Sequence, residues 1–142
     1  MPEGFRLRVL SPEGTACDQV VSAVTLPSLQ GEITVLPEHM PVVVALTDGE
    51  IRAVTAEGEI SLAVEGGFAR VEKQGVTVLS DFAAGTEGIE PARAQEAKRR
   101  AEELLKESRE KKDIALAERD LHRAILQLNV AEKLRRRRPR RP

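Results

Sequence analysis

Hydrophobic and polar positions follow two different periods in this sequence, and the change falls within residues 85–94, GTEGIEPARA. Before this stretch, apolar residues tend to alternate with polar ones, as in Phe5-Arg6-Leu7-Arg8-Val9, which is the period of a half-buried strand. After Gly88 there is no glycine, and alanine and leucine recur every third or fourth position, as in an amphipathic helix. The pattern predicts a β domain, a hinge and a helical arm.

Turn signals divide the first part of the chain into short strands. Ser11-Pro12-Glu13-Gly14 is typical of a turn, with Pro at its second position and Gly at its fourth. Pro27 is expected to end the second strand, and Pro37 and Pro41 to bracket a loop. The predicted strands are residues 5–9, 20–26, 33–36, 42–46, 51–54, 60–64, 68–71 and 76–79. Short strands at this spacing, with no crossover helix between them, predict an antiparallel β-sandwich or barrel.

The residues after Gly88 predict an antiparallel hairpin of two helices. Pro91 suits the first helical position, with Glu90 as the N-cap. Residues 108–113 contain no hydrophobic residue and predict a turn, with Asp113 as the cap of the second helix. The residues that share one face of the first helix are Ala94, Ala97, Ala101, Leu104, Leu105 and Ser108. The seam of the second helix is Ile114, Ala117, Leu121, Ala124, Leu128 and Ala131, widened by Ile125 and Leu134.

The predicted fold class is therefore α+β, with an N-terminal antiparallel β-sandwich followed by a C-terminal two-helix hairpin. Residues 1–84 are expected to form the β-sandwich domain and residues 85–90 the hinge. Residues 91–134 are expected to form the helical hairpin, and residues 135–142 a disordered, Arg-rich tail. Alanine-rich seams bury little area per residue, so pairing of the two helices should be modest, and such an arm can open.

Composition and charge exclude several classes of function. Aromatic residues make up 2% of the chain, too few for a nucleic-acid surface that works by base stacking. The first 88 residues carry 5 basic and 13 acidic side chains, and the remainder carries 17 basic and 10 acidic. A single cysteine, Cys17, excludes an intrachain disulfide. The N-terminus lacks the apolar run of a signal peptide, and no stretch approaches the length of a membrane span.

The sequence contains no motif of a catalytic site. There is no Walker-type loop, no HExxH and no GxSxG, and neither His39 nor His122 has partners at metal-ligand spacing. His122 is expected at a solvated helical position, and Cys17 is interpreted as a small structural residue. The arginines from Arg135 to Arg141 would suit RNA or anionic lipid, or a solubilising terminus, and composition leaves these open.

Several segments, in order along the chain, resemble one known family. Residues 31–41, GEITVLPEHMP, are similar to a GELGILPGHAPL loop, residues 65–72, EGGFARVE, to an SGGFLEV strand, and residues 76–81, VTVLSD, to a VTVLAD strand. Residues 90–98, EPARAQEAK, resemble a DxxRAxEAK helix start, and Arg123-Ala124 with Val130-Ala131-Glu132 resemble the second helix. The family is the epsilon subunit of the F-type ATP synthase, of the bacterial and chloroplast type. The resemblance extends to about Leu134.

This resemblance implies a non-catalytic rotor subunit that binds the gamma subunit and sits on the membrane ring of c subunits. It implies a peripheral location on the cytoplasmic side of the cell inner membrane, indirect membrane contact and no nucleic acid. The loop that carries Glu32 and His39 would face the c ring, and Glu38 stands where the family commonly has glycine. The helical arm would extend along gamma toward the alpha and beta catalytic subunits and inhibit ATP hydrolysis. The arginine tail would suit such a contact.

The resemblance also implies ATP as a regulatory ligand of the folded hairpin, with no cofactor required. Residues 89–94 match an I/L-D-x-x-R-A motif, which assigns Ile89, Glu90, Arg93, Ala94 and, on the second helix, Arg123 to the site. In this chain Glu90 replaces the motif's Asp, and Gln127 and Ala84 replace an arginine and a glutamate of the family pattern. Because the site has one cation fewer than the family pattern, we expect it to bind phosphate groups more weakly.

Two other readings use the same features. An RNA- or ribosome-associated adaptor would use the basic arm, but it leaves the 31–41 loop unexplained. A passive structural linker would keep the arm permanently folded.

Overall fold

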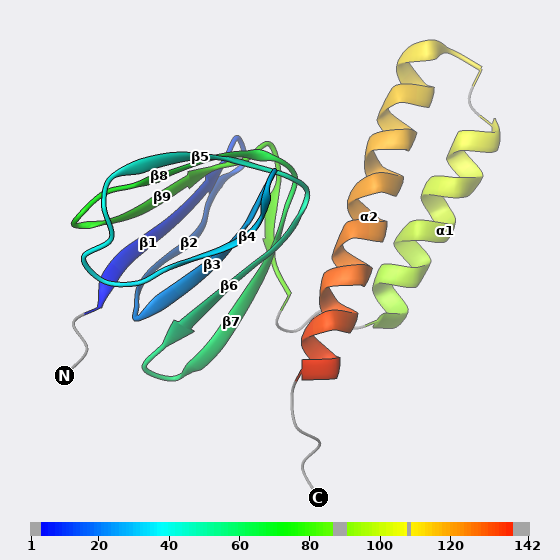
Figure 1. The fold of residues 1–142 in the computed structure, drawn as a ribbon. Helices are drawn as coiled ribbons and strands as arrows, with labels where there is room; N and C mark the ends of the chain where they lie inside the picture. Colours follow the sequence, from blue (N-terminus) through cyan, green and yellow to red (C-terminus); the bar gives the residue numbers. More distant parts are fainter. Residues whose placement is uncertain (1–3, 87–90, 108, 138–142) are drawn as a thin grey trace, which may run out of the picture. The chain divides into compact units, whose positions relative to one another are not determined.

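The structure, a computed structural model, describes residues 4–86, 91–107 and 109–137 (Figure 1). The chain divides into two compact units, Met1–Gly85 and Thr86–Pro142. The first is built from strands and the second from two helices, so the predicted α+β class is confirmed.

Residues 4–86 form ten strands, and each predicted strand except 20–26 corresponds to one of them. Their bounds are β1 (Phe5–Ser11), β2 (Gly14–Val21), β3 (Ala23–Ser28), β4 (Gly31–Val35), β5 (Val42–Leu46), β6 (Gly49–Thr55), β7 (Gly58–Val64), β8 (Gly67–Val71), β9 (Gly75–Leu79) and β10 (Ala83–Gly85). The turn predicted at residues 11–14 is confirmed, because it joins antiparallel β1 and β2. The short gaps between predicted strands 51–54 and 60–64 and between 68–71 and 76–79 are also hairpin turns, which follow Thr55 and Val71.

The predicted strand 20–26 is wrong, because the chain bends at Ser22 and the segment belongs to two strands. The Ser22 N–H donates to the Val54 carbonyl across 2.8 Å, which holds the bend against β6. Pro27 does not end β3 but lies within it, opposite Glu32 of β4. Its carbonyl accepts a hydrogen bond from the Thr47 N–H at 2.8 Å, so the residue stays bonded although proline has no donor.

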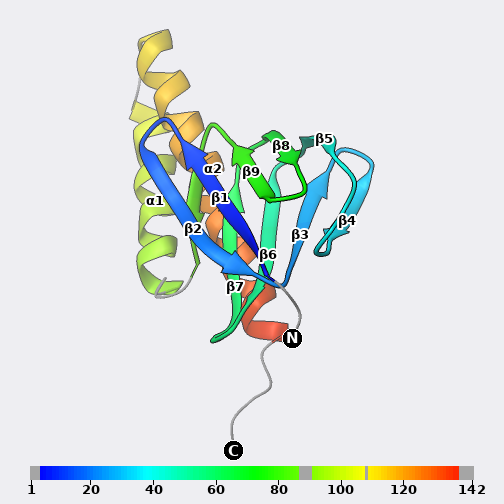
Figure 2. The ribbon, with the colours of Figure 1, turned by 90° about the vertical axis from the view of Figure 1, so that its left-hand side faces the viewer.

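The strands form one continuous hydrogen-bonded sheet that folds back on itself (Figures 1 and 2). The order is β10-β7-β6-β3-β5-β8-β9-β1-β2, with β4 paired to β3 outside this path. All pairs are antiparallel except β1 with β9, which is a correction to the purely antiparallel prediction. A parallel pair needs a long connection, and here β2 to β8 supply it. Cα atoms of β2 and β10, near the two ends of the order, approach within 8 Å, so the sheet nearly closes around its core.

The alternation along β1 shows how the sequence builds this core. Phe5, Leu7 and Val9 are buried, whereas Arg6 and Arg8 are exposed, so successive residues point to opposite faces of the sheet. The remaining core is aliphatic, in line with the few aromatic residues of the chain. Its most deeply buried members include Val21, Val24, Leu26, Val35, Ile51, Val64, Val71, Val76 and Val78.

Helices α1 (Pro91–Glu107) and α2 (Lys111–Arg137) pack side by side as an antiparallel hairpin (Figure 1). The seam of α1 is Ala94, Lys98, Ala101 and Leu105, of which the alanines are buried and the other two half-buried. Ala97 and Leu104 are exposed, so assigning them to the packed face was wrong. The seam residues are spaced four, three and four apart, so they form one row that faces the partner helix. Ala97 and Leu104 lie beside that row. Ser108 lies outside the described residues.

The predicted seam of α2 is confirmed, and a second apolar row accompanies it. Seam positions Ala117 and Ala124 are buried, and Ile114, Leu121, Leu128 and Ala131 are half-buried. The second row is Leu126, Val130 and Leu134, and all three are also buried. At about 100° per residue Leu126 lies nearly opposite Ala117 and Ala124, whereas Leu134 lies only about 60° around the helix from Ala131 of the seam. Leu134 is buried beside the seam and widens it as predicted, whereas Ile125 remains 37% exposed.

Both ends of α2 differ from the prediction, whereas the start of α1 agrees with it. Helix α1 does begin at Pro91, but Glu90 lies outside the described residues. Helix α2 begins at Lys111, because the Ile114 N–H donates to the Glu110 carbonyl at 3.0 Å. Asp113 therefore lies in the first helical turn and is not the cap. In the first turn its negative charge still interacts favourably with the helix dipole. The helix also continues past Leu134 to Arg137, into the predicted tail, and residues 138–142 lie outside the described residues.

The predicted hinge begins with structured residues. Gly85 is the last residue of β10 and lies opposite Leu62 of β7, and Thr86 is 4% exposed. The rest of the hinge, residues 87–90, lies outside the described residues. A strand of three residues carries almost no periodic signal, which is why β10 escaped the sequence analysis.

The conformation of Gly67 yields a prediction about stability. Its φ is 105°, and a Cβ atom there would lie 2.0 Å from the Leu79 carbonyl oxygen of the neighbouring strand. Replacing Gly67 with Ala should lower the free energy of unfolding of the full-length chain by about 2–4 kcal/mol, because backbone of two paired strands must move apart. Urea unfolding followed by circular dichroism measures this.

The matched control is Gly85→Ala. This glycine has no positive φ, and nothing lies within 4 Å of the position of its Cβ. The Gly85→Ala substitution should change the free energy of unfolding by less than about 0.5 kcal/mol. Equal losses in both variants would contradict the close approach at Gly67.

Candidate partner-binding site

The loop between β4 and β5 opens with a type II turn at Leu36-Pro37-Glu38-His39. The His39 N–H donates to the Leu36 carbonyl at 3.3 Å, and Pro37 occupies the second position of the turn. Glu38, at the third position, has a φ of 66°. This geometry requires a positive φ there and is normally taken by glycine. A residue with a Cβ is held in this left-handed conformation at a cost of about 1–2 kcal/mol.

His39 is exposed, and its ring is oriented by its own loop. Nδ1 lies 2.7 Å from the Met40 carbonyl oxygen. Because a carbonyl can only accept, the proton of this contact sits on Nδ1, and in the neutral ring Nε2 is the acceptor. The loop thus holds the exposed ring in a defined orientation, with Nε2 left as the acceptor.

Glu32, the other predicted contact residue, is engaged within the β unit. Its carboxylate accepts a hydrogen bond from the Arg52 guanidinium, which reaches from β6 across β3. The Glu32 side chain remains 64% exposed, whereas that of Arg52 is 30% exposed. Arg52 was missed by the sequence analysis, since it lies in a different strand and only the tertiary register brings it to Glu32.

The loop also exposes apolar side chains. Leu36 is 56% and Met40 79% exposed, and Val42, which follows the loop, is 40% exposed. Exposed apolar side chains grouped on one loop mark an interaction surface more often than a chance placement. We call residues 36–41 the β4–β5 loop.

A second apolar surface lies on the outer face of β8, β9 and β1. Phe68 and Leu79 are direct cross-strand neighbours, and each is more than half exposed. Leu79 is in turn opposite Leu10 of β1. An open groove of about 550 Å³ runs over them and is lined by Leu10, Ser11, Pro12, Gly67, Phe68, Leu79, Ser80 and Asp81. The sequence analysis did not single out Phe68, although its alternation with buried Ala69 places it on the outer face.

Charged pairs surround this outer face. Arg70 of β8 binds Glu72 at 2.6 Å, and Arg6 of β1 forms two bonds of 2.7 Å with Asp18 of β2. The hydrogen bond from Arg6 holds the pKa of the Asp18 carboxyl below its usual value. Next to Asp18, burial raises the pKa of the Cys17 thiol, and the negative charge of Asp18 adds to this effect. Cys17 is 7% exposed and packs in the core, so its interpretation as a structural residue holds.

The described part of the nucleotide motif is spread over both helices. Arg93 is exposed in the first turn of α1, Ala94 is buried in the seam, and Arg123 is half-buried on α2. Ile89 and Glu90 lie outside the described residues. ATP binding by these residues stays a prediction.

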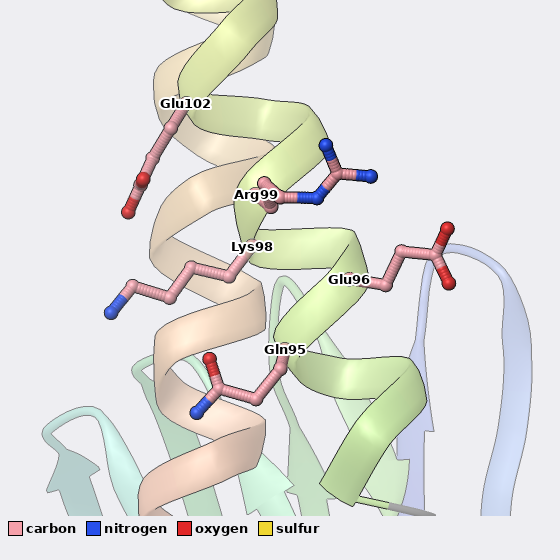
Figure 3. A pocket seen from close by; sticks show the side chains of 5 residues that line it. All are labelled: Gln95, Glu96, Lys98, Arg99 and Glu102. Atoms are coloured by element: carbon pink, nitrogen blue, oxygen red, sulfur yellow. The ribbon is translucent and has the colours of Figure 1, made fainter.

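An open pocket of about 510 Å³ lies along α1, apart from that motif. It is lined by Gln95, Glu96, Lys98, Arg99 and Glu102. Figure 3 shows these side chains fanning out from a single helix, with Glu96 and Arg99 on one side and the other three on the opposite side. Arg99 pairs with Glu103 at 2.9 Å and Arg100 with Glu96 at 3.1 Å, as expected on a solvated helix face. Among the described residues, only side chains of this one helix line the pocket, so it is an open surface and does not enclose a ligand.

The described residues offer no site for a metal ion and no membrane span. Within residues 4–86, 91–107 and 109–137, His, Cys, Asp and Glu side chains form no group of three that could hold a metal. None of the helices described is both long and apolar enough to cross a bilayer. His122 is exposed on α2, which agrees with its predicted solvated position.

Comparison with known proteins assigns both units. Residues 4–85 match the family model of the β-sandwich domain of the ATP synthase delta/epsilon chain, and residues 87–132 match that of its long α-helix domain. The chain belongs to the ATP synthase delta/epsilon family. The division between the two matches falls beside the boundary between the two compact units.

Relatives in bacteria carry the name of the epsilon chain. The ATP synthase epsilon chain of Dehalococcoides mccartyi (strain CBDB1) is 39% identical over 92% of this chain and 94% of its own length. The epsilon chain of Desulforamulus reducens is 36% identical over 93% of this chain and 100% of its own length. Epsilon chain 2 of Ralstonia nicotianae is 43% identical over 81% of this chain and 84% of its own length. The identification as an epsilon subunit, a non-catalytic part of the synthase, is confirmed.

A solved structure shares the fold. It is a chain of the Euglena gracilis mitochondrial ATP synthase assembly of OSCP, F1 and c ring, with a TM-score of 0.61 and 22% identity. The alignment covers 96% of this chain and 82% of that one. The reading as an RNA- or ribosome-associated adaptor has no support in these comparisons.

The type II turn predicts that Glu38→Gly stabilises the isolated chain. Glycine adopts the left-handed conformation without strain, and its greater freedom in the unfolded chain offsets part of the gain. The free energy of unfolding should therefore rise by about 0.5–1 kcal/mol. Urea unfolding of the two proteins measures the difference.

Glu13→Gly is the matched control, because Pro12-Glu13 is also an exposed Pro-Glu turn but Glu13 has no positive φ. This variant should be less stable than wild type by up to about 1 kcal/mol. Stabilisation by both substitutions would mean that the gain does not come from the turn geometry at Glu38.

Proposed function

We propose that this epsilon-type chain is a central-stalk rotor subunit that connects gamma to the c ring and inhibits ATP hydrolysis through its helices. The observation that carries the proposal is the match of both family domains, in order, over nearly the whole chain. The two units suit different tasks, because the β unit has a deep aliphatic core and the arm is held by an alanine seam.

The β4–β5 loop supports the proposed seat on the c ring. It places exposed Leu36 and Met40 beside His39, whose ring is oriented by the Met40 carbonyl. Glu32 lies on the strand that leads into this loop, held by Arg52. A protein–protein interface usually combines an apolar core with a polar, hydrogen-bonding rim, and this loop offers both kinds of group. Through the ring the subunit would be peripheral to the inner membrane, on its cytoplasmic side.

The groove over β8, β9 and β1 supports the proposed contact with gamma. Phe68 is an exposed aromatic side chain next to exposed Leu79, and Arg70 lies two residues along the same face of β8. Aromatic anchors with arginine nearby are enriched at the centres of interfaces. The groove belongs to the rigid β unit, so it would hold gamma independently of the state of the arm.

The helical arm supports the proposed regulatory role. Its seam alternates alanine with larger residues, so the two helices bury little area between them and separate at modest cost. A hairpin needs one apolar stripe, whereas α2 carries a second row at Leu126, Val130 and Leu134. The arginines of the last turn would give the arm a cationic surface for the alpha and beta subunits.

Reconstitution with gamma and the catalytic subunits tests this function. A chain ended after Gly88 should still bind gamma, and the ATP hydrolysis rate should exceed that with the full-length chain severalfold, because the arm is missing. Removing only residues 135–142 should give part of this increase, since the cationic end is lost. Steady-state hydrolysis at saturating ATP measures both.

The double variant Arg99→Gln/Arg100→Gln is the control for charge on the arm. These arginines are exposed and pair within α1, so removing them should leave the hydrolysis rate unchanged. Rates that are equal for the full-length chain and the chain ended after Gly88 would argue against an inhibitory arm.

ATP as a regulatory ligand is tested by isothermal titration of the isolated full-length chain. We expect saturable heat that is lost in Arg93→Ala and Arg123→Ala and kept in Arg119→Ala, an exposed arginine of α2 outside the motif. ATP at ten times its dissociation constant would stabilise the folded hairpin by about 1.4 kcal/mol. No heat at millimolar ATP would remove nucleotide sensing from the mechanism.

A further inference from the structure

Glu38 holds an unfavourable backbone conformation without a compensating contact in its own chain. Its φ of 66° is the only positive value at a non-glycine position among the described residues. The side chain is exposed, and its carboxylate has no hydrogen bond or ion pair within the part of the chain that the structure describes. Backbone strain of this kind tends to persist where it serves a function.

The other polar side chains near the turn are already engaged. Glu32 is bound by Arg52, and Nδ1 of His39 lies 2.7 Å from the Met40 carbonyl oxygen. Glu38 therefore contributes the uncommitted charge of this loop, at the tip of a rigid turn. Leu36 and Met40, on either side of the turn, expose apolar surface around that charge.

We propose that Glu38 is a further contact residue of the β4–β5 loop, whose carboxylate binds an arginine or lysine side chain of the ring that the loop faces. This inference rests on the proposed seat of the loop on the c ring. When Leu36 and Met40 are covered, water is excluded around the carboxylate and its attraction to a cation strengthens. An anionic lipid surface is a poor occupant, because it would repel the carboxylate.

The turn explains why the charge sits at this position. The third residue of a type II turn lies at the outer corner of the loop, flanked by a rigid proline and a hydrogen-bonded His39. A glycine would relax the backbone but would leave the corner without a side chain. The chain thus keeps a less stable turn that carries a fixed anion.

The experiment measures binding of full-length variants to the cognate complex of gamma and c ring in detergent micelles, at low and moderate salt. Glu38→Gln and Glu38→Gly should each weaken binding roughly tenfold and reduce its salt dependence, although the glycine variant is the more stable protein. Glu38→Asp should keep part of the salt-dependent affinity. Glu13→Gln, with the same charge change at another exposed Pro-Glu turn, should bind like wild type.

Met40→Asp separates failure of this inference from failure of the proposed seat. If Met40→Asp weakens binding while Glu38→Gln binds like wild type, the role of Glu38 is overturned and the loop remains the docking surface. If neither variant weakens binding, the loop is not the docking surface, and both proposals are overturned.

Discussion

The parallel pairing of β1 with β9 is the contact on which the β unit depends. It joins the first strand of the chain to the last hairpin, and β1 in turn pairs with β2. Without this pairing, β1 and β9 would each be an open edge of the sheet. The unpaired backbone groups of such an edge are a site for aggregation. The pairing also aligns Leu10 with Leu79, and thus assembles the groove beside Phe68.

The two units differ in how they are stabilised, and this difference supports a division of labour. The β unit buries a contiguous aliphatic core from β1 to β9. The hairpin relies on alternate alanines, such as Ala101 and Ala117, which remove little apolar surface from water. A firmly folded unit suits a permanent seat on rotating partners, and a weakly paired hairpin suits an element that changes state.

The candidate site could be located from the sequence, but its chemistry could not. Residues 31–41 drew attention through their family resemblance and their prolines. The engagement of Glu32 by Arg52 depends on β4 and β6 flanking β3, which no local pattern encodes. The left-handed conformation of Glu38 follows from a type II turn, and Pro37 alone is compatible with type I as well. Phe68 could have been found from its alternation with Ala69, yet its cross-strand neighbour Leu79 could not.

The sequence by itself determined the features that arise from local periodicity and turn chemistry. These include the hairpins after Ser11, Thr55 and Val71, the burial alternation of β1, and the seam of α2 at Ala117 and Ala124. The tertiary structure alone decided the parallel β1–β9 pair, the split at Ser22 and the burial of the Leu126 row. The physical reason is that a strand's period determines which face it buries but not which partner it pairs with. That choice depends on closing one sheet around one core, over contacts far apart in the chain.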